Sequence, residues 1–240
     1  MRSILLGVLG ALVATTGSAQ EPIKLVGFDA LPFSSVNDGR SLSGAGYDFA
    51  ADLFKSAGIP FVSEGQPIQR LLESLDRGNT VAIYLVRTPA REDKYTWIGG
   101  LVEDDGFAFM TLPDRPRVDD FETARGLKMV GAIISPAVKN MLVSNGVTAI
   151  DETAAEGQNL KKLLAGRFDA WFTTNTVARY MVKDAGLPPT SITIGKQLIP
   201  SSGWMVGSKS LPAETVQKLQ AAFAAAKADG RFAAFRAKLN

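Results

Sequence analysis

Short apolar runs alternate along the chain with segments whose apolar residues recur every three to four positions. Residues 81–86 (VAIYLV) are apolar without a break, which is typical of a strand buried on both faces of a parallel sheet. Residues 23–28 and 60–63 also have the composition of strands. Residues 49–57 and 68–75 instead have helical spacing, and Gly58 and Gly78 are expected to end the two helices. The order strand, helix, strand, helix, strand predicts a parallel sheet.

The alternation begins again after an acidic segment at residues 103–106 (EDDG), which has the composition of a turn. Further strands are predicted at residues 127–134, 147–150, 168–172 and 204–206, with helices between them and a long Ala-rich helix at 212–228. Two such runs with a strand and a helix left over predict an α/β protein of two lobes, each a mostly parallel sheet flanked by helices. Lobes joined by two strands can hinge and close around a ligand.

The first 19 residues have the pattern of a secretory signal peptide. One basic residue precedes an apolar stretch at residues 4–14, and Gly17-Ser18-Ala19 provides a small-residue cleavage site. We therefore expect cleavage after Ala19 and a periplasmic protein. No later segment approaches the roughly 20 apolar residues that span a bilayer.

The sequence contains neither Cys nor His. This composition excludes a thiol nucleophile, a Ser-His-Asp triad and a zinc site built from thiolates or imidazoles. The 26 basic and 24 acidic residues are nearly balanced and scattered, so nucleic acid is not an expected partner. We predict a monomer without metal or cofactor.

A loop with two guanidinium groups follows the apolar run at residues 81–86. It contains Arg87, Thr88 and Arg91, and it leaves the edge of the sheet at which ligands bind in open α/β proteins. The planar guanidinium donates to both oxygens of a carboxylate. Arg91 therefore has two open roles, which are to hold the carboxylate of a ligand or to pair with an acid of the protein. Arg87 fits a positioning role better than a ligand contact.

Several motifs, in their order and spacing, resemble those of the family 3 extracellular solute-binding proteins of polar amino acid ABC transporters. They are Pro32-Phe33, Gly46-Tyr47-Asp48, residues 71–78 (LLESLDRG), Thr88-Pro89-Ala90-Arg91 before Trp97, residues 121–130, residues 164–170 (LAGRFDA) and residues 227–232 (KADGRF). Residues 67–70 resemble a subgroup with P-x-x-R at this place. The resemblance implies a type II periplasmic binding fold, with a signal peptide at 1–19, lobe I at 20–103 and 201–240, and lobe II at 104–200.

The resemblance also implies roles for single residues. In that family the Arg of T-x-x-R, here Arg91, holds the ligand's carboxylate together with N–H groups at a helix start in lobe II. The Asp that usually holds the α-ammonium group is replaced by Thr174, and a neutral hydroxyl cannot compensate a buried ammonium. Pro136, beside Ser135, lacks an N–H donor. These departures favour an organic acid or a modified amino acid over a standard α-amino acid.

The candidate ligand-binding residues lie at predicted sheet edges, at helix starts or in loops that follow strands. They are Phe28, Phe33, Arg70, Tyr84, Thr88, Arg91, Ser135, Thr173, Thr174, Asn175 and Trp204. The aromatic residues could form a wall against an apolar part of the ligand or pack in the core. Arg70 could contact the ligand or form a surface salt bridge. Ser135 is expected to cap a helix.

The hypothesis from the sequence is a protein without catalytic activity that captures a small carboxylated solute, an amino acid or organic acid, between two lobes. It would deliver that solute to an inner-membrane ABC permease. One alternative is a ligand-sensing module without transport. Another is a dehydratase-like enzyme on the same scaffold, which would need an acid with a raised pKa between the lobes; Glu64, Glu73 and Asp169 are the acids nearest to predicted sheet edges.

Overall fold

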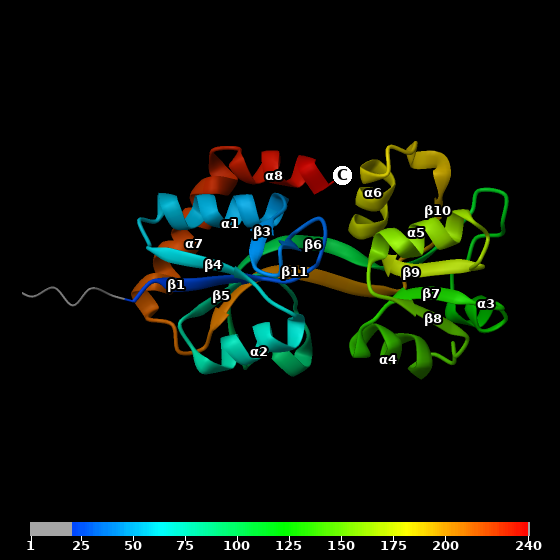
Figure 1. The fold of residues 1–240 in the computed structure, drawn as a ribbon, viewed down its shortest axis with the longest axis horizontal. Coiled ribbons are helices and arrows are strands. Elements are labelled where there is room, and N and C mark those ends of the chain that lie inside the picture. The colour runs from blue at the N-terminus through cyan, green and yellow to red at the C-terminus, as the bar shows by residue number, and fades with distance from the viewer. Residues whose placement is uncertain (1–20, 240) are drawn as a thin grey trace, which may run out of the picture.

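The computed structural model describes residues 21–239. The predicted signal peptide at 1–19 lies outside this range. Two lobes lie side by side along the long axis of the molecule and share one sheet (Figure 1). Within the described range no helix combines the length and the apolar character that crossing a bilayer requires.

The sheet has nine strands, and its order explains the two lobes. The strands run in the order β4 (Phe61–Gly65), β1 (Ile23–Gly27), β5 (Thr80–Val86), β11 (Ile199–Ser208), β6 (Tyr95–Thr111), β9 (Ala170–Thr174), β7 (Val130–Ile133) and β8 (Ile150–Thr153), while β10 (Thr193–Ile194) pairs with β6. Strands β4, β1 and β5 are parallel in lobe I, and β9, β7 and β8 are parallel in lobe II.

Strands β6 and β11 connect the lobes. They are antiparallel to each other from Tyr95↔Ser208 in lobe I to Phe107↔Ile199 in lobe II. The predicted turn at residues 103–106 is therefore wrong, because these residues lie inside the 17-residue strand β6. The acidic side chains of Glu103 and Asp104 are exposed on this strand, so their polarity reflects contact with water and not a change of direction.

In lobe I, helices cover both faces of the sheet. Helices α1 (Ala45–Ser56), α7 (Ala213–Ala228) and α8 (Arg231–Leu239) pack on one face, against Leu25 and Ile83, and α2 (Ile68–Arg77) packs on the other, against Val26 and Leu85. Neighbouring residues of one strand thus bury opposite faces, which confirms the reading of residues 81–86 as a strand covered on both sides. Strands β2 (Ser35–Asn37) and β3 (Ser41–Ser43) form a separate hairpin.

Lobe II repeats this arrangement. Helices α3 (Phe121–Arg125) and α4 (Pro136–Ser144) pack on one face, while α5 (Glu156–Leu164) and α6 (Asn175–Asp184) pack on the other. The strand predicted at 147–150 is displaced, since β8 begins at Ile150. Val147 is 1% exposed because it fills the core from the turn after α4, and such a buried turn residue cannot be told from a strand residue by hydrophobicity.

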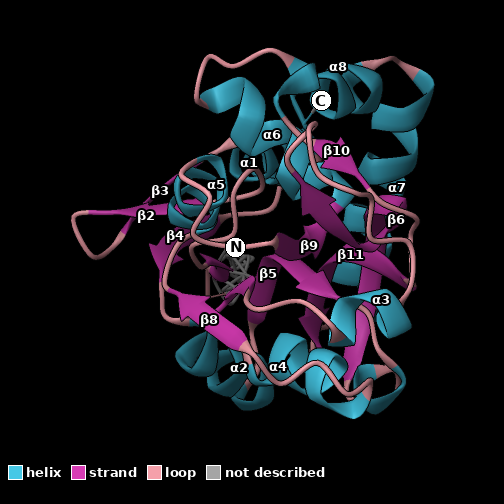
Figure 2. Ribbon diagram, turned by 90° about the vertical axis from the view of Figure 1, so that its right-hand side faces the viewer, coloured by secondary structure: helices cyan, strands magenta, loops and turns pink. Residues whose placement is uncertain are grey.

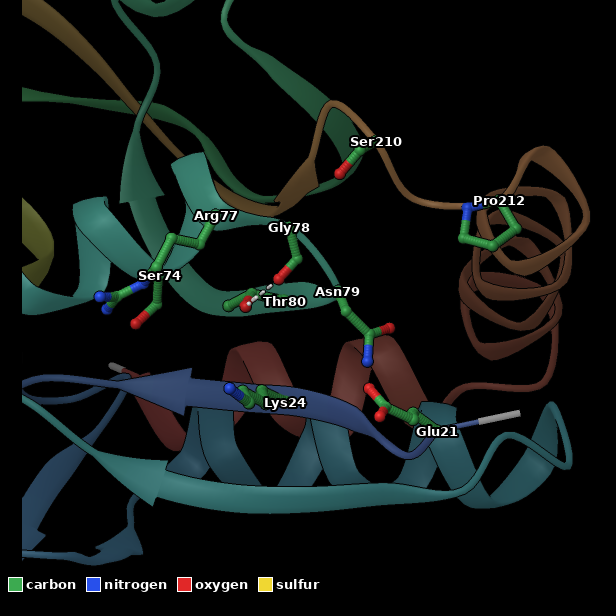
Figure 3. Close-up of a pocket in the computed structure, with 9 residues that line it drawn as sticks. All are labelled: Glu21, Lys24, Ser74, Arg77, Gly78, Asn79, Thr80, Ser210 and Pro212. Atoms are coloured by element: carbon green, nitrogen blue, oxygen red, sulfur yellow. Dashed lines mark hydrogen bonds between the residues drawn. The ribbon is translucent and has the colours of Figure 1, made fainter. Parts of the chain in front are cut away.

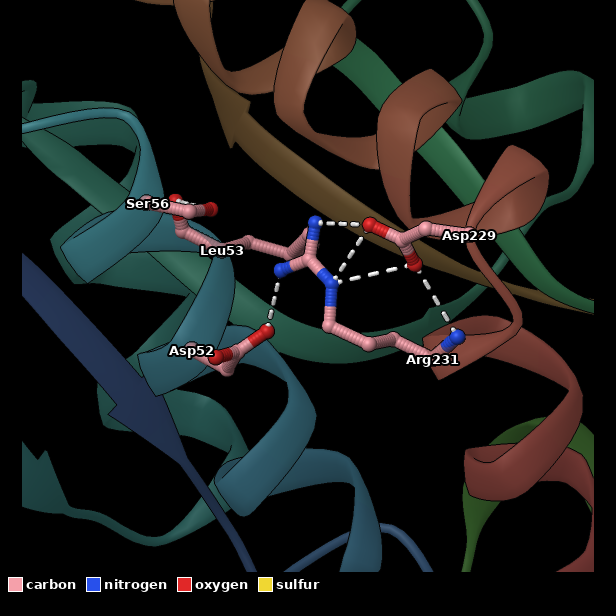
Figure 4. A network of polar contacts seen from close by, with 5 residues as sticks. All are labelled: Asp52, Leu53, Ser56, Asp229 and Arg231. Atoms are coloured by element: carbon pink, nitrogen blue, oxygen red, sulfur yellow. Dashed lines mark hydrogen bonds and ion pairs between the residues drawn. The ribbon is translucent and has the colours of Figure 1, made fainter.

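The C-terminal helices are fastened to the N-terminal part of lobe I by Arg231. Its guanidinium pairs with Asp229 at the end of α7, at 2.8 Å between Nη2 and Oδ2, and with Asp52 of α1 (Figure 4). The hydrogen bonds that the Arg231 guanidinium donates to Asp229 and Asp52 raise the pKa of Arg231 above its ordinary value. Residues from both parts of the chain therefore build one lobe.

Candidate functional site

The parallel strands of both lobes end between the lobes. β5 is antiparallel to β11, β11 is antiparallel to β6, and β6 is antiparallel to β9. The strands of lobe I therefore run toward lobe II, and those of lobe II run toward lobe I. The carboxyl ends, which are the ligand-binding edges of open α/β sheets, face each other.

Arg91 lies at this edge, in the short helix η1 (Pro89–Arg91) that follows β5. The side chain is half-buried, and its Nη1 donates to the carbonyl oxygen of Val86 at 3.0 Å. Among residues 21–239 no acid lies within ion-pair distance of Arg91. Burial lowers the pKa of Arg91, because a charged group is less stable away from water. The ion pair with an acid of the protein, one of the two roles open to Arg91, is thus not formed.

A cavity of about 500 Å³ lies beside Arg91, between α2 and the segment that follows β5. Thr88 and Arg91 line it from lobe I, and Ala137, in the first turn of α4, lines it from lobe II. The remaining lining residues are Gln69, Leu72, Glu73, Asp76, Ala90, Lys94 and Tyr95. We call this space the Arg91 cavity.

A second cavity, of about 520 Å³, lies at the opposite edge of the lobe I sheet (Figure 3). Lys24 near the start of β1, Thr80 at the start of β5 and Pro212 before α7 line it, so it is at the amino ends of the strands. None of the residues predicted from the sequence lines this cavity. It also lacks a residue of lobe II, and we do not assign it to the site.

Two predicted aromatic residues, Phe33 and Phe28, lie against Tyr84. Phe33 stacks on Tyr84 with ring centroids 4.0 Å apart and an angle of 9° between the planes, and Phe28 is tilted at 6.4 Å. Phe33 is 2% exposed and belongs to the core of lobe I, whereas Tyr84 is partly exposed. Burial raises the pKa of Tyr84, the negative charge of Asp105 raises it further, and the positive charge of Arg91 opposes both effects.

Trp204 contacts Arg87. The Arg87 guanidinium carbon lies 4.6 Å from the centroid of Trp204 and 5.1 Å from that of Trp97, and Nε donates to Oε2 of Glu92 at 2.8 Å. Trp97 and Trp204 belong to the connecting strands β6 and β11. Arg87 thus connects the start of the loop that contains Arg91 to both connecting strands, β6 and β11. Arg70 is exposed on α2 and does not line the Arg91 cavity.

The predicted residues of lobe II gather at helix starts. Ser135 accepts a hydrogen bond from the Val138 N–H at 3.5 Å and caps α4, and Thr174 accepts one from the Val177 N–H at 3.4 Å and caps α6. Asn175 is the first residue of α6, and its Oδ1 is enclosed without a hydrogen-bond donor from the described chain.

Thr173 is 2% exposed, and its hydroxyl donates to Oε1 of Glu156 at 2.9 Å. Glu156 also accepts hydrogen bonds through Oε2 from Asn159 at 2.8 Å and from Trp171 at 2.9 Å. Burial raises the pKa of Glu156, and these three bonds oppose the rise. Glu156 could not be singled out from the sequence, because an acid in the first turn of a helix is common.

Asp105 is the second residue that the sequence did not indicate. It is 8% exposed, and its Oδ1 accepts the N–H groups of Gly106 at 2.8 Å and of Thr176 at 3.2 Å. Asp105 therefore ties the strand β6 to the start of α6. The acidic run around it hid this role, because the run resembled a solvated turn.

Neither a protein-family model nor a curated protein sequence matches the chain. Solved structures do match it. An ancestral arginine-binding protein bound to glutamine has a TM-score of 0.69 and 20% identity, with 90% of this chain and 96% of that chain covered. A histidine kinase sensor domain with similarity to periplasmic binding proteins has a TM-score of 0.73 and 15% identity, with 91% and 96% covered. The chain has the periplasmic-binding-protein fold.

A third match is the arginine-, lysine-, histidine-binding protein ArtJ from Geobacillus stearothermophilus, with a TM-score of 0.70, 18% identity and 90% and 94% of the two chains covered. The periplasmic-binding-protein fold confirms the predicted architecture of two α/β lobes joined by two strands. At these identities the likeness shows the fold and not the ligand.

Proposed function

We propose that this protein is an exported solute-binding protein that captures a small carboxylated solute between its lobes and delivers it to an inner-membrane ABC permease. One observation carries the proposal: the half-buried guanidinium of Arg91 lies beside a cavity that both lobes line, and no acid of the described chain is within ion-pair distance of it. A half-buried cation without a counter-charge is unfavourable by itself, and an incoming carboxylate compensates it.

The surroundings of Arg91 suit such a ligand. Nη1 uses one donor on Val86, which leaves the other N–H groups of the fork for a carboxylate. Thr88 adds a hydroxyl, and Ala137 brings the positive end of the α4 dipole to the same cavity. A ligand held from both lobes binds the closed form better than the open form and shifts the population toward closure.

Membership of family 3, in the subgroup with P-x-x-R, is part of this proposal. The motifs from Pro32-Phe33 to residues 227–232 support it, as do solved neighbours such as the substrate binding protein of an amino acid ABC transporter, at 16% identity and a TM-score of 0.68. The pattern of residues 1–19 supports export to the periplasm. Binding proteins and sensor domains among the neighbours support a role without catalysis.

A sensing role is the second candidate. Two neighbours favour it, the histidine kinase sensor domain and the BvgS VFT2 domain of Bordetella pertussis, which has a TM-score of 0.70 and 18% identity. Uptake of the identified solute is measured in cells that lack this protein. Uptake should be lost if the protein is a transport component and should persist if it is a sensor.

A thermal-shift screen tests the proposal. Amino acids, dicarboxylates and aromatic acids are compared with their primary amides, which keep the shape and lose the charge. A ligand at about 100 times its Kd stabilises the folded form by about 2.7 kcal/mol, which raises the midpoint by roughly 5 to 10 °C in a chain of this size. We expect at least one acid to give such a shift and its amide to give none.

The screen is repeated with two matched variants. Arg91→Met removes the guanidinium from the cavity, and Arg125→Met removes one that also donates to a backbone carbonyl, that of Asn145 at 2.8 Å, but on the exposed surface of lobe II. The shift should disappear in the first variant and persist in the second. Amides that stabilise the wild type as well as acids do, or a screen without a stabilising acid, would overturn the proposal.

A further inference from the structure

We propose that Arg236 is a positioning residue for solute binding, although it lies outside the Arg91 cavity. It fixes the bend of β6 between the lobes, and the helix that carries it, α8, opposes closure of the lobes over the cavity. The inference rests on the proposed function, because it assumes that a solute is bound by closure over the Arg91 cavity. Three observations carry it.

The first is that the pairing of the two connecting strands is irregular in the middle of β6. The neighbours Gly203 and Trp204 of β11 pair with residues 102 and 100 of β6, so Leu101 is an extra residue in the ladder. A second shift follows directly, since residues 103 and 104 of β6 lie opposite Ser202 alone. Bulges of this kind bend a strand. Residues 101–104 are therefore the place at which the connection between the lobes can bend.

The second is that Arg236 spans both irregular places. Its Nη1 donates to the carbonyl oxygen of Leu101 at 3.0 Å, and its Nη2 donates to Oδ1 of Asp104 at 2.9 Å. The hydrogen bond from Arg236 also holds the pKa of Asp104 below its ordinary value. Both N–H groups belong to one planar guanidinium, so the two acceptors cannot move apart without the loss of a hydrogen bond. Arg236 therefore holds β6 in the bend that the structure shows.

The residues on either side of this bend are tied to different lobes. Lys227 of α7 pairs with Glu103, at 3.7 Å between Nζ and Oε1, which adds a second tie to the C-terminal helices of lobe I. Asp105 instead accepts the N–H of Thr176 at the start of α6, in lobe II. A change in the angle between the lobes must therefore act on the few residues that Arg236 holds.

The third observation is the position of α8 relative to lobe II. Helix α8 contacts α6, and both lie on one face of the shared sheet, whereas α2 and α4 lie on the other (Figure 1). Residues of α2 and Ala137 of α4 line the Arg91 cavity, so the cavity belongs to the second face. Because the lobes turn about the strands between these faces, closure over the cavity moves α6 away from α8. Wider opening is blocked, since α6 already touches α8.

The contacts of Arg236 thus make closure less favourable than it would be without them. Closure changes the bend of β6, which breaks a bond to Leu101 or Asp104, and it separates α8 from α6. The apparent affinity for a solute rises with the population of the form that binds it. Arg236→Met should therefore bind the solute about threefold or more tightly, while its Tm falls. A residue with a purely structural role would lower the Tm without tightening binding.

The first experiment measures the spacing of the lobes without a solute. The chain contains no Cys, so spin labels attach only at two introduced positions, Arg77→Cys on α2 and Val143→Cys on α4, where both native side chains are exposed. Pulsed electron paramagnetic resonance gives the distance between the labels in this protein and in the same protein with Arg236→Met. We expect Arg236→Met to add a population with a shorter distance. An unchanged or longer distance overturns the inference.

Arg231→Met is the matched control, because Arg231 also belongs to α8 but its ion pairs, with Asp229 and Asp52, lie within lobe I. It should lower the Tm and leave the label distance unchanged; the same shortening in this control would overturn the specific role of Arg236. If Arg236→Met does not fold, Asp104→Asn takes its place, since this exposed side chain keeps its size and loses its charge. A distance distribution of Asp104→Asn without a shorter component then counts against the inference.

The second experiment is a calorimetric titration with an acid that stabilises the wild type in the thermal-shift screen. Arg236→Met should bind this acid about threefold or more tightly than the wild type does. Equal or weaker binding overturns the inference and leaves the carboxylate site of Arg91 intact. A screen in which no acid binds overturns the proposed function, and the label distances then decide by themselves whether Arg236 holds the lobes apart.

Discussion

Replacing Gly203 with Ala should disturb the stack of Tyr84 on Phe33. A Cβ at this position would lie 2.1 Å from Cε2 and 2.9 Å from Cδ2 of Tyr84, whereas ordinary contacts begin at 3.4 Å. The Tyr84 ring would have to move by about 1.3 Å, the difference between 3.4 and 2.1 Å. The ring is stacked on Phe33, which is 2% exposed, with centroids 4.0 Å apart, so its movement would disturb this buried stack.

We expect Gly203→Ala to lower the free energy of unfolding by about 1–3 kcal/mol, the usual cost of overpacking. Urea unfolding measures this loss, and a double-mutant cycle identifies its cause. In the Tyr84→Ala background the ring is gone, so Gly203→Ala should cost less than about 0.5 kcal/mol.

Gly126→Ala is the matched control. Gly126 has an ordinary φ of −84°, and the nearest atom to an added Cβ is 3.6 Å away. This substitution should be neutral or stabilising by up to about 1 kcal/mol, through the unfolded state. A Gly203→Ala loss that is the same with and without the Tyr84 ring would refute the reasoning.

Three further predictions concern other contacts. Burial raises the pKa of Glu156 in the folded protein. The wild type is therefore most stable relative to Glu156→Gln at low pH, where Glu156 is protonated. It loses this advantage as the pH rises from about 4.3, the ordinary pKa of Glu, through the raised pKa of the folded state. Urea unfolding of both proteins across this range checks the sign, and a difference that is constant with pH would contradict it. Arg87→Gln should cost about 1 kcal/mol and shift the fluorescence of Trp97 and Trp204, since it removes the cation from both rings; unchanged spectra would argue against the contact. Arg231→Met should lower the Tm, and the loss should shrink at about 1 M salt, where charges are screened beyond roughly 3 Å; a loss independent of salt would point to packing instead.

The sequence predicted elements whose cause is local. Residues 81–86 are apolar on both faces, and the structure has β5 at Thr80–Val86. Ser135 is of a residue type that often caps helices, and its hydroxyl accepts a hydrogen bond from the Val138 N–H. Gly58 and Gly78 were expected to end helices, and their φ values are positive, as a chain that leaves a helix often requires.

The sequence could not predict elements that depend on contacts with residues far away in the chain. The strand β6 passes through residues 103–106 because β11 pairs with it from a position about 100 residues later, and no local pattern shows that pairing. The burial of Asp105 depends on the same strand and on the start of α6, at Thr176. Part of the candidate site therefore became visible only when segments distant in the chain were placed side by side.

For Arg91 the sequence left two roles, and the choice depended on what surrounds it in space. The described chain offers it a carbonyl oxygen and a cavity but no acid within ion-pair distance. A residue count could not have shown this, because the nearby sequence contains acids such as Glu92 and Asp93. Glu92 instead pairs with Arg87.

Calorimetric titration of Arg91→Glu with an acid that binds the wild type tests the central claim most directly. The substitution replaces the donor fork with a second negative charge, and loss of a charge pair of this kind costs at least about 2–5 kcal/mol. We predict that the affinity falls by a factor of about 30 or more, while Arg125→Glu binds like the wild type. An Arg91→Glu variant that binds the acid as tightly as the wild type would contradict the account.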